Sequence, residues 1–201
     1  MVSGPFERGR SRPADPTALK ILVAGAFGVG KTTLVGAVSD IKTLQTEESL
    51  TEAGRPVDDI RAVSGKRSTT VAMDFGRITI SDSVIVYLFG TPGQERFRFL
   101  WDELARGALG ALILVDTRRL ADSFSVVDFF ETRGLPFAVA VNCFDGAIRY
   151  PPEQVRRALD LDEDVPVMLC DARERASARD ALVAVVEHAL HRSARQRSAV
   201  S

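Results

Sequence analysis

The residues best suited to chemistry form the run Gly-Ala-Phe-Gly-Val-Gly-Lys-Thr at 25–32. Two glycines, a lysine and a hydroxyl residue at this spacing match the phosphate-binding loop. An apolar, branched run at 19–24 predicts a buried strand before the loop, and 33–38 predicts a helix after it. A strand, a glycine-rich bend and a helix start aim backbone N–H groups at one point. The run therefore predicts a site for a polyphosphate.

The polar residues of this loop have separate predicted tasks. Lys31 brings a mobile positive charge to the terminal phosphates, so we assign it to catalysis as well as binding. Thr32 places a hydroxyl where the Mg²⁺ of a nucleoside triphosphate binds. The loop residues expected to contact nucleotide are Gly28, Val29, Gly30, Lys31, Thr32 and Thr33.

Composition narrows the class of protein. The 201 residues suffice for one domain, and a formal net charge of −1 gives no reason to expect nucleic acid or an anionic membrane as a partner. Cys143 and Cys170 form no metal-ligand or disulfide pattern, so we expect a cytoplasmic protein. The sequence encodes no apolar run long enough to span a membrane and no lipidation signal, so membrane contact would require recruitment through partners.

The order of predicted elements indicates an α/β fold. Residues 1–17 are predicted to form a disordered arm, 18–192 the domain and 193–201 a tail, and the polar stretch 41–68 is predicted to be a long connection. Strands at 69–80 and 84–89 are close enough for an antiparallel hairpin. Further strands are expected at 111–115, 137–141 and 165–169, alternating with helices at 95–105, 121–133, 152–159 and 176–192. This alternation predicts a mostly parallel sheet covered on both faces, with ligands at the carboxyl ends of its strands.

The segment after the 84–89 strand, Gly-Thr-Pro-Gly-Gln at 90–94, resembles the second switch of Ras-like small GTPases, whose usual form is Asp-x-x-Gly-Gln. The resemblance implies that the N–H of Gly93 meets the γ-phosphate and that Gln94 orients the attacking water, a positioning role in catalysis. Gly90 stands where the aspartate that helps to hold Mg²⁺ is expected. We therefore expect weak metal binding and slow hydrolysis.

Two later strand ends complete the resemblance. Asn142-Cys-Phe-Asp145 is similar to the guanine-recognition motif Asn-Lys-x-Asp, in which Asp145 would accept two hydrogen bonds from guanine and Asn142 would tie the segment to the phosphate loop. Cys143 replaces the lysine, which implies weaker binding with guanine preference retained. Cys-Asp-Ala-Arg at 170–173 is similar to the Ser-Ala-Lys loop, so Ala172 would offer its N–H to guanine O6.

A threonine is expected to sense the γ-phosphate and to ligate Mg²⁺. Thr70 is preferred because Thr-Val-Ala-Met-Asp-Phe at 70–75 resembles the sensor and strand of Rab-type members, and Thr69 and Ser68 remain alternatives. Three arginines of the preceding connection are candidates for a catalytic arginine or for solvated charges: Arg55, Arg61 and Arg67. Arg96 and Arg98, beside Gln94, are weighed in the same way.

The combination resembles the bacterial members of the Ras-like small GTPases, closest to the actinomycete conservon GTP-binding proteins and related cell-polarity GTPases. It implies a P-loop NTPase three-layer sandwich whose six-stranded sheet has one antiparallel edge strand. It also implies a GTP/GDP switch with Mg²⁺, with a roadblock/LC7-type regulator and a sensor-kinase-like conservon protein as partners. Two other functions stay open: a non-hydrolysing nucleotide-dependent scaffold, and an ATP-specific P-loop ATPase or kinase.

Overall fold

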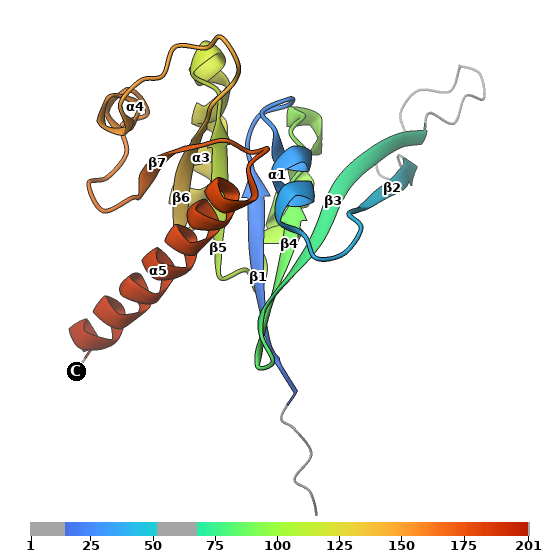
Figure 1. Cartoon of the computed structure of the whole chain (residues 1–201), viewed down its shortest axis with the longest axis horizontal. Helices are drawn as coiled ribbons and strands as arrows, with labels where there is room; N and C mark the ends of the chain where they lie inside the picture. Colours follow the sequence, from blue (N-terminus) through green and yellow to red (C-terminus); the bar gives the residue numbers. More distant parts are fainter. Residues whose placement is uncertain (1–14, 52–67, 201) are drawn as a thin grey trace, which may run out of the picture.

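The protein folds around a central sheet with helices on both faces (Figure 1). The structure, a computed structural model, describes residues 15–51 and 68–200. Within them the strand order is β2-β3-β4-β1-β5-β6-β7. The strands are β1 Thr17–Ala24, β2 Leu44–Thr51, β3 Ser68–Ser81, β4 Val84–Gly90, β5 Gly110–Val115, β6 Phe137–Asn142 and β7 Val167–Cys170. This architecture confirms the predicted P-loop NTPase sandwich.

The middle of the sheet is parallel because crossover helices connect its strands. β1 pairs in parallel with β4 and β5, and β5, β6 and β7 continue the series. All six residues of β5 and all six of β6 are buried, as expected of strands covered on both faces. Their carboxyl ends therefore open onto one rim of the molecule.

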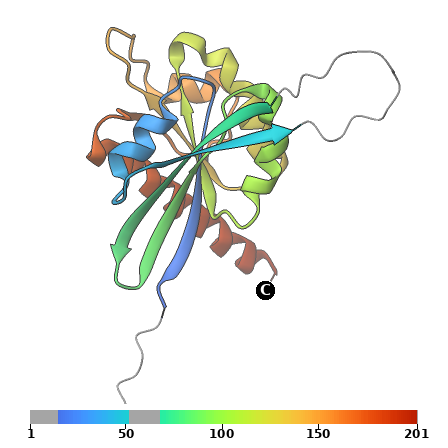
Figure 2. The same ribbon diagram turned by 90° about the vertical axis from the view of Figure 1, so that its right-hand side faces the viewer.

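The predicted hairpin is present, but the prediction of the sheet edge is wrong. β3 pairs antiparallel with β4, and Figure 2 shows this long hairpin (green) beside β1 (blue). β3 also pairs antiparallel with β2, whose eight residues come from the stretch predicted as a connection. The described sheet therefore has seven strands, and the strand that runs against the others is second from the edge. The charged, polar sequence of β2 suits an exposed edge strand. Because it lacks apolar alternation, the sequence does not predict its pairing with β3.

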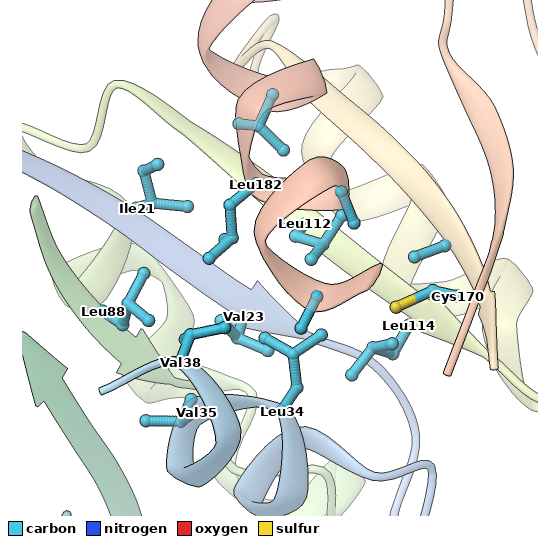
Figure 3. Close-up of a cluster of buried hydrophobic side chains, with 14 of the residues drawn as sticks. Ile21, Val23, Leu34, Val35, Val38, Leu88, Leu112, Leu114, Cys170 and Leu182 are labelled. Carbon is cyan, nitrogen blue, oxygen red and sulfur yellow. The ribbon is translucent and has the colours of Figure 1, made fainter. Parts of the chain in front are cut away.

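Two apolar cores separate the sheet from its helices. On one face α1 (Lys31–Val38) and α5 (Arg175–Val200) cover a cluster that includes Ile21, Val23 and Leu34 (Figure 3). The other cluster contains Leu22, the next residue of β1. The alternation along β1 follows from the two-residue period of a strand.

The second cluster lies under the remaining helices, α2 (Phe99–Ala105), α3 (Phe124–Thr132) and α4 (Pro152–Ala158). Short 3₁₀ segments, Glu95–Phe97 and Thr117–Ser123, lead into α2 and α3. The predicted helices at 95–105 and 121–133 therefore each begin with a tighter turn.

The ends of the domain differ slightly from expectation. β1 begins at Thr17, and α5 continues to Val200, so most of the predicted tail at 193–201 is helical. The arm at 1–14 and the three arginines Arg55, Arg61 and Arg67 lie outside the described residues. In the described part of the chain, no helix combines the length and apolar character needed to cross a membrane.

Candidate nucleotide site

The phosphate loop bends from the end of β1 into the start of α1, as the sequence predicts. Lys31 is the first residue of α1, and only 9% of it is exposed. Its Nζ donates hydrogen bonds to the carbonyl oxygens of Gly25 at 2.9 Å and Ala26 at 2.8 Å. Burial lowers the pKa of Lys31 to about 8, against an opposing effect of the Asp74 carboxylate. An ammonium group has three donors, so one remains for a phosphate oxygen.

A carboxylate that sequence analysis missed stands beside the predicted metal ligand. The Thr32 hydroxyl donates to Oδ2 of Asp74 at 2.7 Å, from the start of α1 to the middle of β3. A Cβ on Gly90 would lie 3.0 Å from the Asp74 Cβ and 3.1 Å from its Oδ2. The missing side chain at Gly90 therefore makes room for a carboxylate from the neighbouring strand.

This arrangement corrects one expectation. The sequence predicts that Gly90 deprives the site of its acidic group, whereas the structure supplies Asp74 next to Thr32. Asp74 lies in the same segment, 70–75, as the predicted sensor Thr70, and this was the sequence feature that could have indicated it. The pairing of β3 with β4 is what brings Asp74 to the phosphate loop.

The Thr-Pro-Gly turn after β4 lies against the phosphate loop. A Cβ on Gly93 would be 2.6 Å from the Lys31 Nζ and 2.8 Å from the backbone nitrogen of Phe27, so only glycine fits here. Trp101 fixes the turn by donating its Nε1–H to the carbonyl oxygen of Pro92 at 3.0 Å. The predicted γ-phosphate contact, Gly93, is thus held at the lysine that would bind the same phosphate.

The residues that follow Gly93 differ from one another in burial and in contacts. Gln94 is half-buried directly after Gly93. Arg98 donates to the carbonyl of Ser125 and lies over Trp101, so it is turned toward α3. Trp101 is buried in the core, whereas Phe99 is 60% exposed.

The loop, β3 and the turn enclose a hollow of about 350 Å³, a size typical of small-molecule sites. Among the described residues, Thr91 is buried here with its hydroxyl oxygen unpaired. Thr32, Asp74 and Thr91 offer the oxygen atoms that a hard cation such as Mg²⁺ prefers. The hollow is lined by Phe27, Gly28, Gly30, Lys31, Thr32, Thr33, Asp74, Thr91, Pro92 and Gly93.

An arginine that sequence analysis did not select also contacts the phosphate loop. Arg119, in the 3₁₀ segment after β5, donates to the carbonyl oxygen of Phe27 at 3.1 Å. Its Nη2 would lie 3.7 Å from a Cβ on Gly28. Arg119 also lies 3.8 Å from the buried carboxylate of Asp116 and 3.9 Å from Asp122.

Asn142 connects the phosphate loop with the end of β7. Its Nδ2 donates to the carbonyl oxygen of Val29 at 2.9 Å, and its Oδ1 accepts the N–H of Ala172 at 3.1 Å. Both contacts are buried. The first is the tie that the sequence predicts. The second engages the N–H assigned to guanine O6, so that role of Ala172 stays a prediction.

Asp145 is exposed at the rim and carries an ion pair. Arg173 bonds both of its carboxylate oxygens, at 2.7 and 3.0 Å, and bonds Asp171 as well. Arg173 lowers the pKa of Asp145 and lowers that of Asp171 to about 2. Asp145 is therefore an ionised acceptor across the physiological pH range.

The predicted sensor threonine, Thr70, belongs to β3, the strand that also carries Asp74. The backbone of Thr70 pairs with Ser49 of β2, four residues before Asp74, which is about 13 Å along a strand. The side chains of Thr69 and Thr70 lie outside the described part of the chain. Their assignment stays a prediction.

The fold and site define a nucleotide-binding P-loop protein with a small-GTPase-like domain. The chain matches, over residues 23–192, the family described as "Conserved hypothetical ATP binding protein", and it belongs to that family.

The chain is also similar to individual proteins and to solved structures. An uncharacterized protein of Methanocaldococcus jannaschii is 32% identical over 129 residues, covering 63% of this chain and 71% of its own. Human Ras-related protein Rab-7b is 24% identical, over 90% of this chain and 86% of its own. The G domain of the T. maritima FeoB iron transporter superposes with a TM-score of 0.60 at 18% identity, covering 86% of this chain and 99% of that domain. The cytosolic domain of the same transporter in a GDP form gives 0.62 at 17% identity, over 87% of this chain and 64% of that one.

The bridge formed by Asn142 yields a prediction about stability. Substituting Asn142→Ala removes the donor to Val29 and the acceptor for Ala172, so two buried backbone groups lose their partners. We expect a loss of about 2–4 kcal/mol in the free energy of unfolding, measured by urea denaturation without nucleotide. Gln154→Ala, an exposed amide on α4, should leave stability unchanged. Equal stability of the Asn142 variant would contradict the bridging role.

Proposed function

We propose that this protein is a guanine-nucleotide switch that binds GTP and GDP with Mg²⁺ and hydrolyses GTP slowly. The observation that carries the proposal is the Asn142 bridge, because it joins the phosphate loop to the two segments that would read the base. A polyphosphate at Lys31 and a base at Asp145 would then belong to one ligand. The Rab-related and G-domain relatives agree with this choice.

The residues of the chain divide the work of phosphoryl transfer. Lys31 binds terminal phosphate oxygens with its remaining donor, and the backbone N–H groups of the loop hold the others. Thr32 and Asp74 are the oxygen ligands suited to Mg²⁺, which would neutralise phosphate charge. Gln94 orients the attacking water, and the backbone N–H of Gly93, which lies beside Lys31, meets the γ-phosphate.

The proposal extends to a signalling system of the bacterial conservon type. Gly90, Gln94 and Asp145 fit the sequence pattern of those proteins. A roadblock/LC7-type regulator and a sensor-kinase-like protein would be the partners, and such a partner would speed hydrolysis. The two free cysteines, Cys143 and Cys170, suit a cytoplasmic setting.

An ATP-binding function is the second candidate, since the family description names ATP. Asp145 separates the two, because its carboxylate can pair with the N1–H and amino group of guanine, whereas adenine lacks that donor pair.

Base choice can be tested directly. We expect wild type to bind GDP more tightly than ADP, and Asp145→Asn to weaken GDP binding by about a hundredfold, because two charge-assisted hydrogen bonds are lost. The affinity for ADP should not change, and the variant should bind xanthosine diphosphate more tightly than wild type does. Titration calorimetry measures all three ligands, with Asp180→Asn on α5 as a matched control. Wild type that prefers ADP would reject guanine recognition.

The role of Asp74 can be tested through metal dependence. Asp74→Asn keeps an acceptor for the Thr32 hydroxyl but removes the charge that would hold Mg²⁺. We expect the Mg²⁺ concentration that half-maximally slows GDP release to rise about tenfold, the scale of one charged interaction. Asp82→Asn, in the turn at the far end of the same hairpin, is the control. An unchanged Mg²⁺ response would remove Asp74 from the metal site.

Turnover separates a switch from a scaffold. Gln94→Ala should bind GTP like wild type but hydrolyse it up to about a hundredfold more slowly, because the water loses its orientation. Single-turnover hydrolysis in excess Mg²⁺ is the measurement, with and without a roadblock/LC7-type partner. Absence of turnover in wild type under both conditions would favour a non-hydrolysing scaffold.

A further inference from the structure

Arg173 spans two carboxylates at the rim of the site. Its Nη1 and Nη2 donate to the two oxygens of Asp145 at 2.7 and 3.0 Å. Its Nε and Nη2 donate to the two oxygens of Asp171 at 2.9 and 2.7 Å. The backbone N–H of Arg173 also bonds Asp171, at 3.0 Å. Asp171 therefore holds the backbone and the Nε of Arg173, and the end of the Arg173 guanidinium reaches Asp145 in the loop after β6.

The geometry of this contact resembles base recognition. Guanine presents its N1–H and its 2-amino group as two parallel donors, and these atoms form part of a guanidine unit. The guanidinium of Arg173 presents the same kind of two-donor fork and places it on both oxygens of Asp145. A base that reads Asp145 needs the same oxygens, so the two contacts exclude each other.

We propose that Arg173 is a built-in competitor for guanine at Asp145, so that nucleotide binding requires this arginine to release the carboxylate. The inference rests on the proposed guanine-reading role of Asp145. Released Arg173 keeps its contacts with Asp171, so it stays at the rim and can return when the base leaves.

Exposure sets the scale of the competition. The side chain of Arg173 is 52% exposed and that of Asp145 is 85% exposed, so solvent weakens the pair. Exposed ion pairs contribute little, and an ideal two-bond geometry puts this one near the upper end of that range. We expect the competition to weaken guanine binding about fivefold. Protonation does not relieve it, because Arg173 keeps the pKa of Asp145 below its usual range.

The competition by Arg173 should affect only nucleotides whose base contacts Asp145. A nucleotide that does not use Asp145 leaves the arginine in place, so its affinity is independent of Arg173. Removing Arg173 should therefore tighten GDP binding and leave ADP binding unchanged. A general electrostatic effect would instead alter both, because both carry the same diphosphate.

The test measures GDP and ADP affinity of the full chain by calorimetry for wild type, Arg173→Ala and Arg173→Gln. We expect GDP to bind about fivefold more tightly to both variants. Arg149→Ala is the matched control, since Arg149 is an exposed charge that acts on Asp145 and Asp171 only through space. It should not reproduce the gain. In the Asp145→Asn background, Arg173→Ala should have no effect, because the contested carboxylate is gone.

The outcomes distinguish this inference from the proposed function. A wild type that prefers GDP, with variants that bind GDP equally or less tightly, would overturn the competitor role and leave guanine recognition intact. The same gain in the Asp145→Asn background, or for ADP, would also overturn it. A wild type without preference for GDP would reject both ideas.

Discussion

The site depends on one buried side chain that joins three strand ends. Asn142 closes β6, donates to the phosphate loop after β1 and accepts from the loop after β7. An amide suits this position because it has a donor and an acceptor on opposite sides, whereas a carboxylate would lack the donor. The parallel central strands make the contact available, since their carboxyl ends meet at one rim. The phosphate loop and the loops after β6 and β7 are therefore held together by one side chain.

The acidic group of the site illustrates how a sheet can replace one residue with another. At the end of β4 a side chain is absent at Gly90, and the space is filled by Asp74 from the adjacent strand. Its carboxylate accepts a hydrogen bond from the hydroxyl of Thr32. The glycine and the aspartate are linked, because a Cβ at Gly90 would lie only 3.0 Å from the Asp74 Cβ and would crowd it. Loss of the usual aspartate does not by itself mean loss of the acidic function.

Features set by neighbouring residues were predictable, and contacts between segments distant in the sequence were not. The phosphate loop and the β3–β4 hairpin follow from neighbouring residues, and Lys31 and Thr32 lie where the loop enters the helix, as the sequence predicts. The edge strand β2 has no apolar alternation, and its pairing with β3 rests on backbone groups that any sequence can supply. Asp74 needs the register of β3 against β4, and Arg119 needs the approach of the segment after β5. No spacing along the chain encodes either contact.

The family description names ATP, while the rim of the site offers the carboxylate of Asp145. Adenine can offer a carboxylate its 6-amino group, but the neighbouring N1 is an acceptor, so adenine cannot supply Asp145 with two adjacent donors. The same carboxylate holds the fork of Arg173, which shows that it is accessible and correctly oriented for a paired donor. The exposed ion pair between Asp145 and Arg173 contributes little to the free energy of folding, so the fold does not depend on it. The carboxylate therefore suits a partner with two adjacent N–H groups, a pair that guanine carries and adenine lacks.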